Sequence, residues 1–460
     1  MSKALALALV LVFLTTSSII VVLPVSGAIA DENSWVEKAP MHQARAGVAA
    51  AVVGEKIYVF GGYNKNGNLD TNEEYNPATD TWTFKAPMPA AGLNYQLAMC
   101  QNKIYLIGKG INYVYNPAND SWETKTPAPT KNYFQVTALD DEIYVIENFN
   151  SNTTYLYDPA NDSWTTKAPI PTATGGTVIA SNHKIYVIGS NTLNPKLKII
   201  QVYDPKTDAW SLSYTPSAVY GGDAAATAGV FAPVRIYFFD SKAVFDPVTG
   251  IWQTRSLPIG APPGLQPDYQ VARPMPTDRT NYAVAVLNDK IYEIGGSFII
   301  MDLTPSPSGY NMQTVYKDTV EEYTPYGYGT ISPVVSVFSP TNMNYSSNEV
   351  SLNFVLNKVV NWTGYILDGI GNVTLSGNTT LTGLTNGVHN VTIYAKDTFG
   401  NLGSSQTINF TIAKPEPLPP PMSFPTIPVA AVSVVAVALA TAGLLANHKK
   451  HKTKTSMVNA

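Results

Sequence analysis

Arginine, asparagine and tyrosine side chains recur at matching positions of this chain, and their chemistry suits ligand binding. Arg45 and Arg279 each stand five residues after a proline, Pro40 and Pro274 respectively. A guanidinium group can bind a carboxylate through two hydrogen bonds, and aromatic rings can stack on a ligand. We align the repeats on the proline of each such element, and at Lys131, Asn132 and Tyr133 the alignment needs a shift of one residue. The expected binding residues are Arg45, Asn94, Tyr95, Lys131, Tyr133, Arg279, Asn281 and Tyr282.

These residues precede short apolar segments, so we expect them around one mouth of the fold, where they could bind a carboxylate or a glycan. The alternative is that they only cap the ends of strands. Residues for catalysis are scarce, because no His–acid pair, nucleophile motif or paired-carboxylate signature stands out in the sequence. The single cysteine, Cys100, lies in QLAMCQNKIY and is expected to be a core residue. We therefore predict no catalytic residue, no metal and no cofactor.

An internal repeat determines how the chain positions these residues. Six of the seven tryptophans are 40 to 47 residues apart, and around them EEYNPATDTW, YVYNPANDSW, YLYDPANDSW, QVYDPKTDAW and AVFDPVTGIW are variants of one motif. Upstream, EKIYVFGG, NKIYLIGK, DEIYVIEN, HKIYVIGS, VRIYFFDS and DKIYEIGG form a second motif. The tryptophans of the array are Trp35, Trp82, Trp122, Trp164, Trp210 and Trp252.

Each repeat predicts four short strands. A small, apolar segment such as GVAAAVVG suits an innermost strand, and I-Y-V-F suits a strand buried on both faces. The Asn/Asp-Pro-x-x-Asp element predicts a turn before a fourth strand that begins at the tryptophan. Four strands in each of several repeats are typical of a β-propeller.

These motifs resemble kelch repeats over residues 31–327, which implies a six-bladed β-propeller. The pattern departs from the family at the glycine pair after the second strand, which is kept only at Gly61–Gly62 and Gly295–Gly296. Galactose-oxidase-like members of this family bind copper through two His and two Tyr, but His42 and His183 stand at different repeat positions. Sialidases and kelch sialate mutarotases, which bind acidic sugars, need an arginine-rich or comparable pocket. The propeller segment has only Arg45, Arg235, Arg255, Arg273 and Arg279.

The tryptophan count predicts how the propeller closes. The sixth I-Y strand, Ile291–Ile294, is followed by EEYTPYG without a tryptophan, whereas Trp35 precedes the first complete repeat. The N-terminal segment SWVEK would therefore supply the outer strand of the last blade and close the ring.

Residues 332–413 have a different pattern, in which strands such as EVSLNFVLN alternate apolar and polar residues. They predict a small antiparallel β-sandwich with Trp362 as its core aromatic. The run GVHNVTIYAKDTFGN resembles immunoglobulin-like modules of archaeal and bacterial surface proteins, and the archaeal type is the closer expectation. Residues 414–428 form a Pro-rich stalk.

Both ends of the chain carry membrane signals. Residues 1–30 resemble a cleaved signal peptide, with an uncleaved anchor as the alternative. Residues 429–446 are an uncharged span long enough for a transmembrane helix, and residues 447–460 are a basic tail that should remain cytoplasmic. We expect a single-pass type I protein of the cell membrane with the bulk of its chain extracellular. The net charge of −4 disfavours a nucleic-acid partner.

Because the N-terminal segment predicts export, the Asn-x-Ser/Thr sequons are candidate glycosylation sites. Six of them are concentrated between residues 344 and 411. We predict glycosylation, although Asn and Thr are also common in exposed β-structure. The acceptor sites are Asn119, Asn152, Asn161, Asn344, Asn361, Asn372, Asn378, Asn390 and Asn409.

The sequence as a whole predicts an all-β surface protein that binds a glycan or protein ligand through propeller loops. A tethered carbohydrate-active enzyme, such as a sugar mutarotase or sialidase, is one alternative. A structural cell-envelope component is the other.

Overall fold

The computed structural model describes residues 32–92, 95–130, 132–216, 219, 222–254, 275–306 and 309–415, with the side chains of 302–311 left out. All secondary structure in these ranges is β, and none of it is a helix that could cross a membrane. The predicted signal peptide, transmembrane segment and basic tail lie outside the described residues, as does the stalk from residue 416 onward.

Six antiparallel sheets of four strands each follow one another along the chain. The first contains β2 (Ala49–Val53), β3 (Lys56–Phe60), β6 (Asn72–Asn76) and β7 (Thr81–Phe84). The second contains β8 (Gln96–Cys100), β9 (Lys103–Gly108), β10 (Ile111–Asn116) and β11 (Ser121–Thr124). The third contains β12 (Gln135–Leu139), β13 (Glu142–Ile146), β14 (Thr154–Asp158) and β15 (Ser163–Lys167).

The next two sheets repeat this order, and the last one departs from it. The fourth contains β16 (Thr174–Ser181), β17 (Lys184–Asn191), β18 (Lys198–Asp204) and β19 (Ala209–Tyr214). The fifth contains β20 (Ala224–Ala226), β21 (Ile236–Phe238), β22 (Ala243–Asp246) and β23 (Ile251–Thr254). The sixth contains β24 (Ala283–Leu287), β25 (Lys290–Ile294), β28 (Val320–Thr324) and β1 (Ser34–Lys38).

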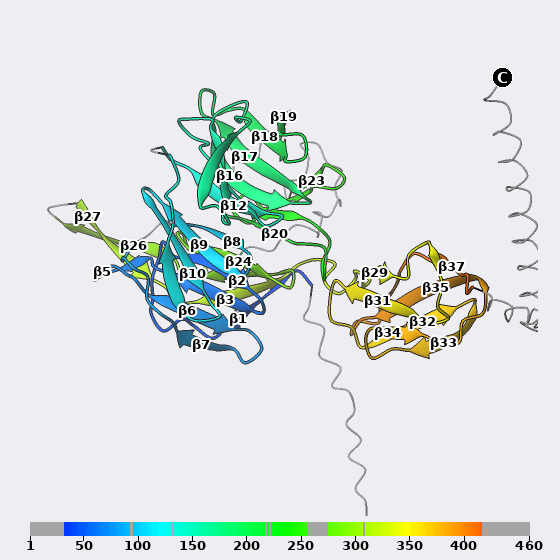
Figure 1. The fold of residues 1–460 in the computed structure, drawn as a ribbon. Coiled ribbons are helices and arrows are strands. Elements are labelled where there is room, and N and C mark those ends of the chain that lie inside the picture. The colour runs from blue at the N-terminus through cyan, green and yellow to red at the C-terminus, as the bar shows by residue number, and fades with distance from the viewer. Residues whose placement is uncertain are drawn as a thin grey trace, which may run out of the picture. The chain divides into compact units, whose positions relative to one another are not determined.

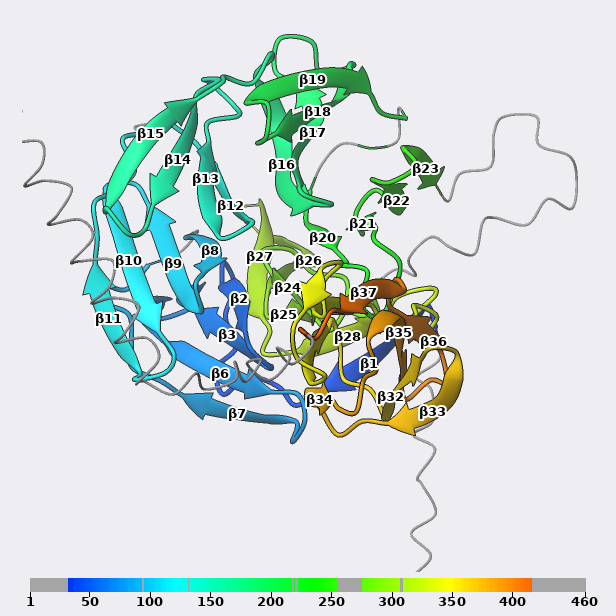
Figure 2. The ribbon, with the colours of Figure 1, turned by 45° about the vertical axis from the view of Figure 1, so that its right-hand side comes forward.

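The N-terminal strand β1, blue in Figure 1, is the outer strand of the sixth sheet and lies beside β28 in Figure 2. It pairs antiparallel with β28, and the pairing runs from Ser34 opposite Thr324 to Lys38 opposite Val320. This is the pairing that the sequence predicted for SWVEK. The unmatched Trp35 therefore stands opposite Tyr323, where each other repeat pairs its own tyrosine or phenylalanine with its own tryptophan.

The innermost strands of successive sheets lie next to one another. In chain order β2, β8, β12, β16, β20 and β24 are neighbours, and β24 is in turn a neighbour of β2. Figure 2 shows these strands facing a common centre, with the later strands of each sheet farther out. Two hairpins lie outside this pattern: β4 (Tyr63–Asn64) with β5 (Gly67–Asn68), and β26 (Ser297–Ser306) with β27 (Gly309–Tyr316).

The conserved spacing of Tyr, Asp and Trp within the repeat forms a clasp that holds neighbouring sheets together. The Tyr115 hydroxyl donates to Asp120 Oδ1 at 2.6 Å, and the Ala86 backbone N–H donates to the same oxygen at 2.8 Å. Trp122 Nε1 donates to the Ala86 carbonyl at 3.0 Å. Both polar groups of Ala86, which follows the outer strand of the first sheet, are thus satisfied by the second sheet.

The same clasp occurs at three other places. Its members are Tyr75, Asp80, Trp82 and Ala39; Tyr157, Asp162, Trp164 and Thr126; and Tyr203, Asp208, Trp210 and Ala168. In the sixth sheet Asn33 takes the place of the aspartate, because Tyr323 donates to Asn33 Oδ1 at 2.9 Å. The fifth sheet has Phe245 and Gly250 at the tyrosine and aspartate positions, so it lacks both the hydroxyl and the carboxylate.

Apolar side chains fill the spaces between adjacent sheets. Ile57, Val59 and Tyr75 of the first sheet pack with Tyr292 and Ile294 of the sixth, and all are buried. Cys100 belongs to the equivalent cluster between the second and third sheets. Its thiol is fully buried and donates to the Asp141 carbonyl at 2.9 Å, and burial raises its pKa to about 11. The predicted core role of this cysteine is confirmed, and its thiol is poorly suited to be a nucleophile.

The later chain forms two further sheets. One contains β29 (Val335–Ser339), β31 (Val350–Leu356) and β34 (Thr379–Leu381). The other contains β30 (Asn344–Tyr345), β37 (Ile408–Ile412), β35 (Gly387–Lys396), β32 (Trp362–Leu367) and β33 (Ile370–Thr374), with β36 (Leu402–Ser404) paired to β35. Phe410, 1% exposed, is the core aromatic here, whereas Trp362 is only half-buried, so the prediction for Trp362 was wrong.

The chain divides into two compact units. Among the described residues, the first comprises 32–335 together with Leu356–Trp362 and Ala395–Ser404. The second comprises Ser336–Val355, Thr363–Tyr394 and 405–415. Two short segments of the later sheets therefore belong to the first unit, a division that no sequence pattern indicated.

Candidate binding site

Arg45 lies inside the first sheet and has no exposed surface. Its guanidinium forms an ion pair with Glu73 Oε1 at 3.0 Å and donates to the Gly61 carbonyl at 2.8 Å. Burial lowers the pKa of Arg45 to about 10, although the charge and hydrogen bond of Glu73 act in the opposite direction. The side chain therefore joins the start of the inner strand to the second and third strands of its own sheet.

Arg279 has the equivalent place in the sixth sheet and is 3% exposed. It forms an ion pair with Glu321 Oε2 at 2.6 Å and donates to the Gly295 carbonyl at 2.7 Å. The two arginines thus share a partner set of one glutamate and the first glycine of a Gly-Gly pair. Their predicted equivalence is correct, but each is buried against its own sheet, which speaks against direct contact with a ligand.

The sequence contained a signal for this structural role. Only the first and sixth repeats combine an arginine, a Gly-Gly pair and a Glu-Glu-Tyr run. Gly61 and Gly295 have φ of +59° and +70°, in the left-handed region that favours glycine. A Cβ on Gly61 would also approach the Gly92 carbonyl oxygen to 2.6 Å. The glycine pair therefore permits the close approach that brings its carbonyl to the arginine.

Tyr133 is the predicted site residue that a ligand can reach. Its side chain is 54% exposed, and it lines two adjoining pockets together with Gln96. The larger pocket, of about 510 Å³, is formed by Gln96, Gly108, Lys109, Asn132, Tyr133 and Phe134 of the second and third sheets. Phe149, which is 47% exposed, meets Tyr133 edge-to-face with ring centroids 6.2 Å apart. Two exposed rings beside amide groups can bind a ligand by packing and hydrogen bonds.

The second pocket, of about 290 Å³, lies where the inner strands of five sheets begin. It is formed by Gln96, Tyr133, Gln135, Thr177, Val178, Gly222, Asp223, Ala224 and Val284. The amide of Gln135 bridges two neighbouring sheets, because Val178 N–H donates to its Oε1 at 2.6 Å and its Nε2 donates to the Tyr133 hydroxyl at 3.3 Å. Sequence reasoning missed Gln96, Gln135 and Asp223, because no repeated motif marks them.

The remaining predicted site residues are dispersed. Tyr282 is buried beside Arg279, whose guanidinium carbon is 5.8 Å from the ring centroid. Asn281 is exposed with φ of +56°, and its carbonyl accepts a hydrogen bond from Gly47 N–H at 2.8 Å. Tyr95 is half-buried. Asn94 and Lys131 lie outside the described residues, as do Arg255 and Arg273.

A third pocket, of about 310 Å³, is formed by the turns at the other end of the inner strands. Its polar groups include His183 and Asp140, whose Nδ1 and Oδ1 are 2.9 Å apart, and both side chains are exposed. His42, in contrast, contacts Glu73 at 2.6 Å and stacks on Phe84. The described residues contain no group of three or more His, Cys, Asp or Glu that could hold a metal ion.

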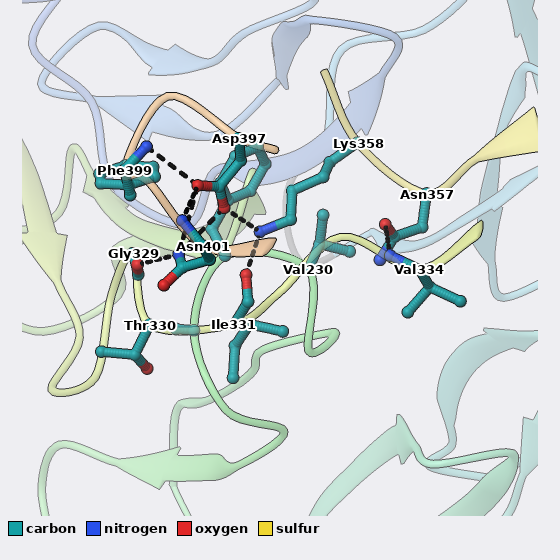
Figure 3. Close-up of polar contacts among 12 residues, drawn as sticks. Val230, Gly329, Thr330, Ile331, Val334, Asn357, Lys358, Asp397, Phe399 and Asn401 are labelled. Atoms are coloured by element: carbon teal, nitrogen blue, oxygen red, sulfur yellow. Dashed lines mark hydrogen bonds and ion pairs between the residues drawn. The ribbon is translucent and has the colours of Figure 1, made fainter. Parts of the chain in front are cut away.

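A buried ion pair in the first unit joins segments that are far apart in sequence (Figure 3). Lys358 Nζ contacts Asp397 Oδ2 at 3.0 Å, donates to the Ile331 carbonyl, and lies 5.1 Å from the centre of the Phe231 ring. Asn401 Nδ2 donates both to Asp397 and, at 2.6 Å, to the Gly329 carbonyl. The cluster therefore holds together segments of the first unit that are far apart in sequence.

Comparison with known proteins places these observations in a family context. The kelch motif model matches residues 44–89. The influenza virus NS1A-binding protein of Homo sapiens is 38% identical over 79 residues, which are 17% of this chain and 12% of that protein. Kelch-like protein 35 of Homo sapiens is 32% identical over 76 residues, covering 16% of this chain and 13% of that protein.

Halomucin of Haloquadratum walsbyi is 36% identical over 119 residues, which are 24% of this chain and 1% of that protein. The chain thus spans 13% or less of the length of these relatives. The matched motif, the relatives and the all-β repeats together support a kelch-repeat protein, a class whose repeats suggest protein binding.

Proposed function

We propose that this chain is a cell-surface receptor or adhesion protein that binds a protein ligand at the end of the six sheets where the inner strands begin. The observation that carries the proposal is the exposed Tyr133, which lines both adjoining pockets at that end. Exposed aromatic side chains surrounded by amides are typical anchors of protein recognition. Human relatives that match the chain include one whose name describes it as binding the viral protein NS1A.

The scaffold of this site is proposed to be one six-bladed β-propeller. Three features support it: six four-stranded sheets, a cyclic order of neighbouring inner strands, and the pairing of β1 with β28. Such closure leaves no free sheet edge. The rigid sheets would then hold the binding loops in fixed positions, as is common for binding proteins.

The surface location rests on the sequence. An N-terminal apolar segment, a C-terminal uncharged span and a following basic tail together favour export and anchoring by one helix. The later sheets and the Pro-rich segment would serve as a spacer, and the sequons would carry glycans. An archaeal type of surface protein, with an immunoglobulin-like module, remains part of this proposal.

The alternatives have weaker support. A sialidase or mutarotase would need accessible arginines, but the described Arg45 and Arg279 are buried in ion pairs. A glycan ligand is compatible with Tyr133, Phe149 and the amides, because aromatic rings can stack on sugars. A structural envelope component would not need the pockets at all. Binding measurements with peptides and with glycans separate these possibilities.

The test is a binding screen with the full chain in detergent micelles against arrays of peptides and of glycans. We expect peptide binding that Tyr133→Ala weakens by about tenfold or more, since an aromatic anchor contributes about 2 kcal/mol or more. The matched control is Tyr214→Ala, because Tyr214 is 68% exposed on the outer strand β19. Binding to glycans alone would favour the glycan alternative, and equal binding by both variants would reject this site.

A further inference from the structure

Three carboxylates of the fifth and sixth sheets, those of Asp223, Asp240 and Glu293, lie close enough to interact electrostatically, and Asp223 lines the 290 Å³ pocket. Asp223 and Asp240 are exposed, whereas Glu293 on β25 has no exposed surface. Neither carboxylate oxygen of Glu293 forms a hydrogen bond in the described part of the chain. A buried, unpaired carboxylate is costly, so its presence needs an explanation.

The β-pairing places Glu293 on the pocket side of its sheet. Glu293 stands opposite Val284 in the antiparallel pair of β25 with β24, and directly opposed residues project to the same face. Val284 lines the pocket together with Asp223. Tyr282, two residues before Val284, is expected on this face as well. Its hydroxyl is buried and faces the Asp223 carboxylate, on which it acts as a hydrogen-bond donor.

The positive charge that acts on Glu293 is already neutralised by another carboxylate. Arg279, which acts on Glu293, forms its ion pair with Glu321 at 2.6 Å. No described ion pair involves Glu293, Asp223 or Asp240. This part of the fold therefore has an excess of acidic groups, and the Glu293 carboxylate has no hydrogen-bond partner in the described part of the chain.

The protonation of these carboxylates reflects that excess. Burial raises the pKa of Glu293 to about 8; the nearby Arg279 opposes this rise, and Glu321, Asp223 and Asp240 add to it. Desolvation and the charge of Asp240 raise the pKa of Asp223 to about 6, although a hydrogen bond from Tyr282 acts in the opposite direction. Desolvation also raises the pKa of Asp240, and Asp278 contributes to that rise. A cation that entered the pocket would favour the ionised forms.

The arrangement of the carboxylates favours one kind of cation. The described carboxylates are not grouped as metal ligands would be, which disfavours a divalent ion. Asp223 is exposed and lines the pocket, and Glu293 is buried on the same face of its sheet as the pocket-lining Val284, so a cation on a long, slender stem suits the arrangement. Lysine and arginine side chains have this form, since an aliphatic stem carries the charge at its end.

We infer that the 290 Å³ pocket, which Asp223 lines and beside which Asp240, Tyr282 and Glu293 lie, binds a lysine or arginine side chain of the protein ligand. The inference rests on the proposed function, because it specifies the chemistry of the ligand at one of the same two pockets. The ammonium or guanidinium group of the ligand would donate hydrogen bonds to the carboxylate oxygens of Glu293, which have no partner in the described part of the chain. The rest of the ligand would extend from this pocket toward Tyr133.

The test uses the full chain and a peptide array in which each sequence is present with Lys, Arg, Gln or Glu at one position. We expect wild-type protein to prefer the Lys and Arg members by about tenfold or more, as charge-assisted hydrogen bonds contribute about 1.5–3 kcal/mol. Glu293→Gln and Asp223→Asn should each remove most of that preference. Asp140→Asn, the same charge change at the opposite end of the inner strands, should leave it unchanged.

Two further readouts separate binding from folding. Glu293→Gln should unfold at a temperature no lower than wild type, because it removes a carboxylate whose ionisation is unfavourable in the folded state. Wild-type affinity for the Lys members should rise between pH 5 and 8 as the carboxylates ionise, and this rise should shrink in Glu293→Gln.

The outcomes distinguish the inference from the proposed function. Peptide binding that depends on Tyr133 but is equal for Lys, Gln and Glu members would overturn the inference and leave the proposed function standing. A preference for basic peptides that Glu293→Gln and Asp223→Asn do not reduce would place the cation site elsewhere. Absence of any peptide binding would overturn both.

Discussion

Tyr323 donates a hydrogen bond to Asn33 at 2.9 Å, and these two residues are separated by 290 positions in the chain. The same bond joins tyrosine and aspartate only five positions apart in four other sheets. The sixth sheet therefore reproduces the local motif of the repeat with residues from the two ends of the array.

The first prediction concerns this joining of the ends. Deleting residues 31–41 should remove β1, expose the edge of β28 and abolish the cooperative unfolding of the six sheets. Substituting Asn33→Ala should have a smaller effect, about 1 kcal/mol of unfolding free energy, because it removes one hydrogen-bond acceptor. Thermal unfolding followed by circular dichroism measures both. An unchanged melting profile after the deletion would show that β1 is dispensable.

The second prediction concerns the clasp. Replacing Asp120 with alanine should lower the free energy of unfolding by about 2–4 kcal/mol, because the Tyr115 hydroxyl and the Ala86 N–H both lose their acceptor. Asp120→Asn is the matched control, since it keeps Oδ1, as Asn33 does in the sixth sheet. Denaturant titration of the three proteins gives the comparison. Equal losses in the two variants would mean that charge, rather than the shared acceptor, provides the stabilisation.

The third prediction distinguishes a structural from a binding role for Arg45. Arg45→Ala should lower the free energy of unfolding by about 3–5 kcal/mol, because Glu73 would stay buried without its guanidinium partner. Lys65→Ala, at an exposed position in the turn between β4 and β5, should have little effect on the free energy of unfolding. Unfolding and ligand binding should be measured on the same samples. A variant with wild-type stability and lost binding would restore the original ligand-binding hypothesis.

The fourth prediction concerns pH. Burial alone would raise the pKa of Asp397, but hydrogen bonds from Asn401 and Lys358 outweigh it and hold this pKa below its ordinary value. The stabilisation is therefore present above the unfolded pKa of about 3.9, and is lost as pH falls through the lower folded value. The unfolding temperature should fall more steeply below pH 4 in wild type than in Asp397→Asn. Identical acid profiles would contradict this contribution.

The repeat period predicted the sheets because each four-stranded unit has its own local pattern. The spacing of Trp35 from the array even indicated which strand pairs with β28. Local patterns give no information on which side chains meet across a sheet, and the burial of Arg45 depends on Glu73, which stands 28 residues away. Only the joint occurrence of arginine, Gly-Gly and Glu-Glu-Tyr in two repeats signalled that pairing.

The pockets were harder to predict for a different reason. The wall of the 290 Å³ pocket takes a few residues from each of five sheets, such as Gln96, Gln135 and Asp223, and these residues occupy no common motif. Tyr133 was found because it aligned with other tyrosines, although its exposure distinguishes it from them. Glu293 replaces the β-branched or aromatic residues of I-Y-V-F, and that single departure from the pattern was the available signal.

The position of β1 also affects when the sixth sheet can be completed during synthesis of the chain. A ribosome makes this strand before any other strand described here, yet its partner β28 is made last among the strands of the six sheets. At synthesis rates of about 5–20 residues per second, the interval between Asn33 and Tyr323 is roughly 15 to 60 s. During that interval β1, with its Trp35 side chain, has no partner strand. A newly made molecule therefore depends on its first strand remaining free of other partners until the sixth sheet is complete.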